Sequence, residues 1–175
     1  MAYRAPVVLA PYSPAWPAMF AAERSTLVEL FPPSVFQIEH VGSTAVPGLA
    51  AKPIIDIMLG TSALGEVESK ITQLLRLGYE YLPEYEQAIP NRRFFAKPKT
   101  QPRIFHLHAV IFGDEFWTSH VVFRDTLRAN PQIAAEYDAL KHALAAKFGD
   151  DREGYTDAKT AFIANVVRDA LREPS

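Results

Sequence analysis

Hydrophobic positions along this chain follow two different periods, and the change between them predicts where strands give way to helices. Alternating or continuous apolar residues mark short strands, whereas apolar residues three or four apart mark amphipathic helices. The alternation over 35–41 and the apolar run over 53–59 predict two strands in the first half of the chain. A helix is predicted to begin at Ser13-Pro14, because a serine N-cap followed by proline at the first helical position favours helix initiation.

The middle of the chain predicts one more helix and three more strands. Apolar residues recur at helical spacing over 66–77, and Gly78 provides a stop signal at the end of this helix. A brief strand near 79–82 follows the glycine. The segments 92–96 and 103–112 predict an antiparallel pair of strands around a loop rich in proline and lysine.

The last third of the chain is predicted to be entirely helical. From Asp114 onward the apolar residues keep helical spacing, and Asn130-Pro131 and 148–150 divide the pattern into three helices. The chain is therefore expected to fold as a single α+β domain over residues 1–175, with a small mixed sheet covered by helices.

Composition and charge exclude several classes of protein. The 18 Lys and Arg residues and 20 Asp and Glu residues give a formal net charge of −2, so neither nucleic acid nor a membrane surface is an expected partner. The absence of cysteine excludes disulfides and thiolate metal sites. No stretch is apolar enough to span a bilayer and no secretory signal is evident, so a cytoplasmic protein is expected.

The glycine-serine turn after the first predicted strand is the first candidate for a binding site. Gly42 lets the backbone approach a ligand closely, and the hydroxyls of Ser43 and Thr44, with nearby peptide N–H groups, can hold a phosphate. The alternative is a polar turn without a ligand, which a Gly-Ser pair alone favours.

Asp56 strengthens the case for a site because it lies in the middle of an otherwise apolar strand. A buried carboxylate is costly unless it is paired with a cation, hydrogen-bonded or bound to a metal. An ion pair with Lys52 or with an arginine would give Asp56 a purely structural role, so both interpretations stay open.

His106 and His108 form the second candidate. Residues i and i+2 of a strand face the same side, so the two imidazoles are expected to project together. Imidazole binds Zn, Mn or Fe and acts as a base near neutral pH, although two histidines alone are equally consistent with a hydrogen-bonded pair. If their strand lies beside the strand of Asp56, the three side chains converge and a metal site is favoured.

Several cations are candidates for binding phosphate. Arg92 and Arg93 are adjacent on a predicted strand, so only one can face the site, and Arg93 is the predicted phosphate ligand. Arg124 shares a helix face with Arg128 and either binds phosphate or belongs to a structural ion-pair network.

Tyrosine-lysine pairs four residues apart recur on two predicted helices, as Tyr137/Lys141 and Tyr155/Lys159. Most pairs of this kind are packing interactions in which the lysine stem covers apolar surface. Either lysine could nevertheless reach a bound anion. No Walker, dinucleotide-binding, zincin or Gly-x-Ser-x-Gly motif is present.

The chain resembles the GrpB family, an uncharacterised group that also occurs fused to dephospho-CoA kinase. The resemblance implies a nucleotidyltransferase-like fold, with Gly42-Ser43 at the glycine-serine turn and Asp56 at the first strand carboxylate. The chain departs from the wider superfamily at Met58, where the second carboxylate would lie. The matching segments span nearly the full length and are Val8–Phe20, Ile38–Asp56, Arg93–Phe95, His106–His108, Trp117, Phe123–Asp125, Leu127-Arg128, and the positions Tyr155, Lys159, Phe162 and Ile163.

Together these features predict an enzyme that transfers a nucleotidyl or phosphoryl group, with a nucleotide or phosphorylated small molecule as ligand and Mg, Mn or Zn as cofactor. A phosphohydrolase using the same residues is a further alternative. A degenerate site that binds a nucleotide or a CoA precursor without turnover is the main rival, because two-metal phosphoryl transfer needs a second carboxylate. The predicted residues are Asp56, His108 and Lys52 for catalysis, Asp56, His106 and His108 for the metal, and Gly42, Ser43, Thr44, Lys52, Arg93 and Arg124 for phosphate.

Overall fold

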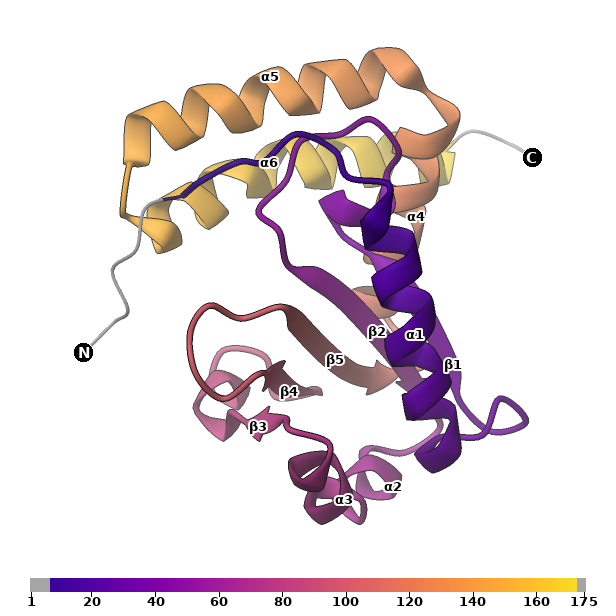
Figure 1. Ribbon diagram of the computed structural model, residues 1–175. Helices are drawn as coiled ribbons and strands as arrows, with labels where there is room; N and C mark the ends of the chain where they lie inside the picture. The colour runs from indigo at the N-terminus through magenta and orange to yellow at the C-terminus, as the bar shows by residue number, and fades with distance from the viewer. Residues whose placement is uncertain (1–6, 173–175) are drawn as a thin grey trace.

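A five-stranded mixed sheet forms the centre of the molecule (Figure 1). The computed structural model describes residues 7–172. The strand order is β1-β2-β5-β4-β3, in which β2 and β5 run parallel and the other neighbours are antiparallel. The strands are β1 (Gln37–Val41), β2 (Ile55–Thr61), β3 (Glu80–Tyr81), β4 (Arg92–Lys97) and β5 (Phe105–Ile111).

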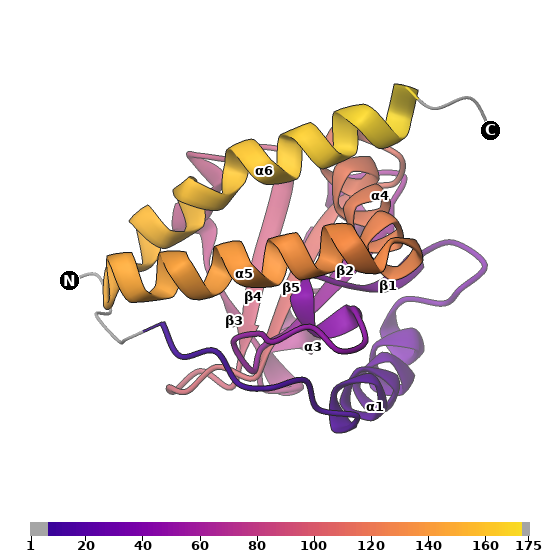
Figure 2. The same cartoon turned by 90° about the horizontal axis from the view of Figure 1, so that it is seen from above.

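Within residues 7–172, six helices surround this sheet, and α4, α5 and α6 follow one another as a helical part after the last strand. Two of them, α5 and α6, lie side by side across one end of the sheet (Figure 2). The predicted α+β architecture, a small mixed sheet with a helical C-terminal third, is confirmed. The helices are α1 (Ala15–Leu30), α2 (Leu64–Glu68), α3 (Ile71–Arg76), α4 (Glu115–Ala129), α5 (Pro131–Phe148) and α6 (Arg152–Arg172), with 3-10 turns η1 (Ser43–Ala45) and η2 (Pro83–Glu86).

None of the helices within residues 7–172 combines the length and apolar character that a membrane span requires.

The two faces of β2 belong to different hydrophobic clusters. Ile55, Ile57 and Leu59 are fully buried on the face covered by α1, α2 and α3. Met58, one residue out of phase, packs on the opposite face with Trp117 of α4. The alternation predicted for a buried strand therefore divides this strand between two layers of helix.

The helix predicted over 66–77 is interrupted in the structure, which replaces it with α2 and α3. Ser69 Oγ donates to the carbonyl of Glu66 at 2.8 Å. The N–H of Lys70 bonds to Val67 O instead of to the Glu66 carbonyl that a continuous α-helix would use. A serine hydroxyl that competes for a helix carbonyl is a known cause of such a break.

A third cluster holds the helical part against the chain that follows η1. Val46 and Leu49 pack with Leu127 of α4 and Tyr137 of α5. The backbone of Ala50 is hydrogen-bonded to α5 at both of its polar groups. Its N–H donates to Asp138 Oδ1 at 3.1 Å, and its carbonyl accepts from Lys141 Nζ. These contacts fix α5 over the turn between β1 and β2.

Candidate active site

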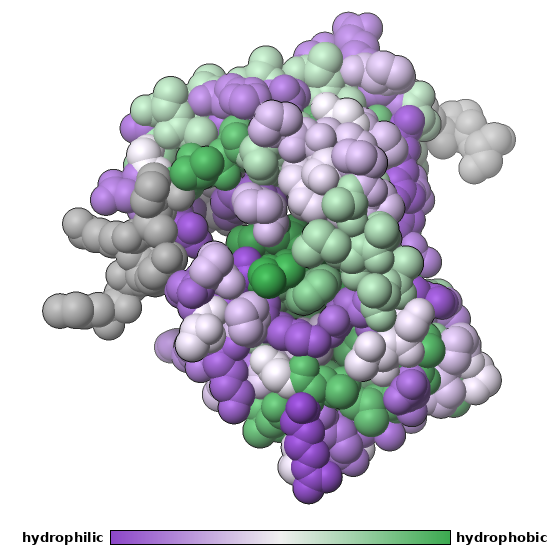
Figure 3. Space-filling model, viewed as in Figure 1, coloured by the Kyte–Doolittle hydropathy of each residue, from purple (hydrophilic) through white to green (hydrophobic). Residues whose placement is uncertain are grey.

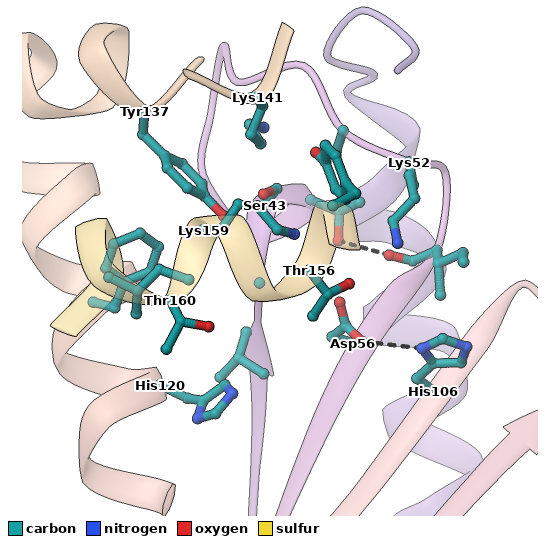
Figure 4. Close-up of a pocket in the computed structure, with 18 of the residues that line it drawn as sticks. Ser43, Lys52, Asp56, His106, His120, Tyr137, Lys141, Thr156, Lys159 and Thr160 are labelled. Carbon is teal, nitrogen blue, oxygen red and sulfur yellow. Dashed lines mark hydrogen bonds and ion pairs between the residues drawn. The ribbon is translucent and has the colours of Figure 1, made fainter. Parts of the chain in front are cut away.

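The carboxylate of Asp56 meets both imidazoles of the histidine strand. Asp56 Oδ1 lies 3.4 Å from His106 Nδ1 and 3.2 Å from His108 Nε2 (Figure 4 draws the His106 contact). One ligand atom from each residue lies within 4.8 Å of the other two, a spacing that can hold a metal ion. The structure therefore brings together the three residues that the sequence predicted for a metal site.

The pairing of β2 with β5 explains this convergence. In the parallel register Asp56 lies opposite His106 and Met58 lies opposite His108. Because side chains alternate along a strand, all four share one face of the sheet. On β1, Val41 pairs with Asp56, so the chain reaches Gly42 directly beside the carboxylate.

The electrostatics of the three residues favour an ionised carboxylate beside a neutral His108. Burial alone would raise the pKa of Asp56, but hydrogen bonds and charge interactions with His106 and His108 outweigh it and lower that pKa well below its usual range. Burial lowers the pKa of His108 to about 4, against the opposing effect of Asp56. Near neutral pH, Asp56 accepts and His108 is uncharged.

The donor set suits some divalent metals better than others. Two imidazole nitrogens and one carboxylate oxygen match the preferences of Zn, Mn or Fe, whereas Mg prefers oxygen ligands. Among the predicted cofactors, Zn and Mn therefore fit these residues better than Mg.

Arg92 of β4 complicates metal binding by His108. Its Nη1 lies 3.4 Å from His108 Nδ1, and its buried Nε has no hydrogen-bond partner among residues 7–172. A guanidinium can only donate, so the Arg92 contact places the imidazole proton on Nε2, the atom that faces Asp56. A metal on Nε2 would require that proton to move to Nδ1, and Arg92 would then have to move away.

A cavity of about 410 Å³ opens above these residues. In the space-filling view the surface is hollowed between the helices at the top and the sheet below, and hydrophobic side chains gather at this hollow (Figure 3). The floor is Asp56, His106 and His108, and the walls come from the turn at Gly42 and from α4, α5 and α6. The volume is in the range of pockets for small ligands.

Three lysines line the cavity, against a single carboxylate, that of Asp56. Lys141 is engaged with Ala50 O and lies 3.9 Å from Asp138. Lys52 and Lys159 contact the ring of Tyr155, and in the described part of the chain no ion pair or hydrogen bond is assigned to either ammonium. The cavity is therefore cationic on the side opposite the sheet.

The predicted residues of the turn divide into two roles. Ser43 lines the cavity (Figure 4). Thr44 also lines it, but its side chain is 1% exposed and its Oγ1 donates to Ile54 O and lies 3.0 Å from Nε2 of the buried His40. The Thr44 hydroxyl thus braces the turn from within.

The structure does not bring the two predicted arginines to the cavity. Arg93 lies on the opposite face of β4, where it pairs with Glu68 and Glu86. The register pairs Phe94 with His108, so it is Arg92 that shares the face of the histidines.

Arg124 is 7% exposed and its guanidinium is occupied elsewhere. It donates to Glu39 Oε2, to the carbonyl of His40 and to Asp125 Oδ1. Arg128 donates from Nε to Ala45 O. These two arginines fasten α4 to the turn, which matches the structural alternative raised for them from the sequence.

His120 of α4 is a cavity residue that the sequence did not indicate. Its Nδ1 lies 2.7 Å from the carbonyl of Phe116, which fixes the proton on Nδ1 and leaves Nε2 as an acceptor. Burial lowers its pKa, so the ring is neutral. A lone histidine on an amphipathic helix carries no spacing signal, and only the packing of α4 over the sheet reveals its position.

The fold and the site define an α+β protein whose central sheet carries a polar and partly cationic cavity. The chain belongs to the GrpB family, since the family model described as "GrpB protein" matches residues 6–169. It is similar to "Glutamate-rich protein GrpB" of Alkalihalophilus pseudofirmus, with 35% identity over 167 residues that cover 93% of this chain and 95% of that protein.

Two further comparisons bear on fold and context. The crystal structure of conserved protein GrpB from Enterococcus faecalis matches with a TM-score of 0.84 and 35% identity, over 94% of this chain and 98% of that one. A dephospho-CoA kinase of Mycolicibacterium paratuberculosis is 29% identical over 189 residues, which cover 95% of this chain and 46% of the kinase. This chain therefore spans about half the length of that relative.

Proposed function

We propose that this protein is a metal-dependent enzyme that transfers a nucleotidyl or phosphoryl group to a small-molecule acceptor. The observation that carries the proposal is the convergence of Asp56, His106 and His108 on the floor of a cationic cavity. A bound divalent metal would supply Lewis-acid polarisation of a phosphoryl oxygen at this position.

The residues of the chain account for the rest of the reaction. Ser43 and the peptide N–H groups of the turn hold the reacting phosphate group, and Lys52 neutralises charge on the phosphate chain linked to it. An acceptor oxygen attacks phosphorus and its P–O bond forms as the phosphoanhydride P–O bond breaks. The leaving group is pyrophosphate in nucleotidyl transfer and nucleoside diphosphate in phosphoryl transfer. The acceptor proton passes to Nε2 of His120.

One feature favours a second candidate, a binding module for a nucleotide or a CoA precursor that does not turn its ligand over. Met58 is fully buried in the cluster with Val41, Val110 and Trp117, at the position where a second carboxylate is expected. The similarity to a protein named dephospho-CoA kinase supports a ligand of this chemical kind for either candidate.

The metal part of the proposal is tested by thermal unfolding with Mn²⁺, Zn²⁺ and Mg²⁺. A ligand at roughly 100 times its Kd adds about 2.7 kcal/mol to the free energy of unfolding. Asp56→Asn and His106→Ala should lose the stabilisation by Mn²⁺ or Zn²⁺, whereas His142→Ala, an exposed histidine on α5, should keep it. Stabilisation that survives both site variants would show that the metal binds elsewhere.

Turnover is tested by incubating the metal-loaded protein with each nucleoside triphosphate and a panel of hydroxyl acceptors. Formation of the modified acceptor, with release of pyrophosphate for nucleotidyl transfer or of nucleoside diphosphate for phosphoryl transfer, that is lost in Asp56→Asn supports the enzyme. Nucleotide binding without consumption, across the whole panel, supports the binding module instead.

A further inference from the structure

Lys52 and Lys159 form a second group of polar side chains in the cavity. This group is distinct from the proposed metal site of Asp56, His106 and His108. Lys52 Nζ lies 5.6 Å from the centroid of the Tyr155 ring, and Lys159 Nζ lies 4.3 Å from the same centroid. Tyr155 is 1% exposed and therefore fixed in place. The two lysines come from segments more than a hundred positions apart in the chain and meet on one rigid aromatic side chain.

This arrangement is unfavourable in the absence of a ligand. Burial, together with the charge of Lys52 and against the opposing effect of Asp56, lowers the pKa of Lys159 to about 8. Burial likewise lowers the pKa of Lys52. Asp56 opposes this lowering but does not cancel it, and the Tyr155 ring that both ammonium groups contact attracts each cation only weakly. The ammonium groups of Lys52 and Lys159 are thus able to bind an anion.

Lys52 and Lys159 differ in their interactions from the third lysine of the cavity, Lys141. Lys141 is 1% exposed and is hydrogen-bonded to the backbone of Ala50, so it serves to hold α5 in place. Figure 4 shows Lys52 and Lys159 directed into the same cavity as Asp56. The site thus has two ends, the floor of the proposed metal site and a pair of ammonium groups that form no ion pair with the residues the structure describes.

We infer that Lys52, Lys159 and Tyr155 form a subsite for the terminal phosphate of a ligand with a phosphoanhydride chain, that is, a molecule carrying at least two linked phosphates. The inference rests on the proposed function and specifies its donor substrate. One phosphate lies at the Gly42-Ser43 turn beside Asp56, and the next extends toward α6. A single orthophosphate reaches one end of the cavity only, whereas a linked chain reaches both.

The test uses inorganic tripolyphosphate and orthophosphate as probes, with binding measured by titration calorimetry in EDTA so that no metal contributes. Tripolyphosphate should bind at least about tenfold more tightly than orthophosphate, since it gains charge-assisted hydrogen bonds at the second end. Lys52→Met and Lys159→Met should each weaken tripolyphosphate binding about tenfold. Methionine keeps the length of the apolar stem, so the packing on Tyr155 is preserved.

Lys99→Met, in the exposed loop after β4, is the matched control and should leave binding unchanged. Lys159→Arg retains the charge and should restore most of the affinity. Circular dichroism and thermal unfolding establish that each variant is folded. Equal affinity for the two probes, or unchanged tripolyphosphate binding in both methionine variants, would overturn the inference.

The outcome is separable from that of the proposed function. If the lysine variants weaken binding while no nucleotide is consumed, the subsite stands and the transfer reaction is wrong. If nucleotides are consumed but the lysine variants bind tripolyphosphate normally, the transfer stands and the subsite is wrong.

Discussion

Gly42 lies directly against the carboxylate of Asp56, so closely that a Cβ at position 42 would lie 2.7 Å from Asp56 Oδ2. Its backbone angles, φ 75° and ψ −175°, belong to a region that side-chain-bearing residues almost never occupy. Glycine is therefore needed here for two independent reasons, the conformation of the turn and the space taken by the acidic side chain.

Gly42→Ala is expected to lower the free energy of unfolding by about 1–3 kcal/mol from backbone strain alone. The new methyl group should also displace the Asp56 carboxylate, so the variant should lose stabilisation by Mn²⁺ or Zn²⁺. Urea unfolding with and without metal measures both effects.

Gly65→Ala in α2 is the control, because its Cβ meets nothing within 4 Å. It should be neutral or stabilising by up to about 1 kcal/mol. A fully stable, metal-binding Gly42→Ala variant would contradict this account.

Removing the Arg92 guanidinium should strengthen metal binding. With the guanidinium gone, His108 Nδ1 is free to carry the ring proton, and Nε2 can bind the metal. Arg92→Met is expected to raise the affinity for Zn²⁺ about tenfold in a competition titration with a chelator dye. Arg93→Met, on the other face of β4, should not change it. Weaker binding by Arg92→Met would show that Arg92 supports the site.

A carboxylate at position 58 should destabilise the protein without creating a second metal site. Met58 is fully buried beside Trp117, and a Cβ on the neighbouring Gly60 would lie 2.8 Å from the Trp117 ring. Met58→Asp should lower the free energy of unfolding by at least about 2–5 kcal/mol, since it loses a buried side chain and buries a charge. Met58→Leu should cost less than about 1.5 kcal/mol.

Calorimetric titration with Mn²⁺ reports the number of metal ions bound by Met58→Asp. One ion or none is expected. Two ions would show that the packing of α4 adapts to restore a two-metal arrangement, and would contradict the view that Trp117 occupies the space.

The affinity for tripolyphosphate should fall as pH rises through about 8. Burial, aided by Lys52, lowers the pKa of Lys159 to about 8, so the ammonium loses its proton above this pH. The affinity falls with pH because a bound anion raises the lysine pKa. With a pKa of about 8 in the ligand-free protein, the fall between pH 7 and pH 9 should be roughly tenfold at most. Lys159→Arg does not titrate in this range, so it corrects for the protonation of the probe itself. Parallel pH profiles for the two proteins would rule out titration of Lys159 as the cause.

The lowered pKa of Lys159 has a defined effect on stability. Its pKa in the folded protein lies below the 10.5 of an ordinary lysine. The charged side chain therefore destabilises the fold fully below about pH 8, and this cost disappears as pH rises toward 10.5.

The strand half of the site follows closely from the sequence. The spacing of His106 and His108 places both imidazoles on one face, and the parallel pairing of β2 with β5 brings that face to Asp56. The choice between Arg92 and Arg93 could not be made in this way, since it depends on whether Phe94 or a neighbouring residue pairs with His108. A shift of one residue reverses which side chain faces the site.

The helical half of the site depends on packing and could not be predicted. Lys159 and His120 enter the cavity only because α4, α5 and α6 close over the turn, and no local pattern encodes that docking. The same helices explain why Arg124 has a structural role, since its guanidinium donates hydrogen bonds to Glu39 and to the carbonyl of His40. A tyrosine-lysine pair on a helix looks identical in sequence whether its lysine faces solvent or a ligand.

The position of α6 also determines when during synthesis the site becomes complete. The five strands of the described chain, and with them Asp56, His106 and His108, have been made once residue 111 has left the ribosome. Tyr155 and Lys159 follow some fifty residues later on the last helix. At about 5–20 residues per second, a growing chain passes through an interval of seconds in which it carries the acidic floor but not the cationic wall. Lys159 therefore becomes available for the proposed phosphate subsite only after all the strands of the sheet have been made.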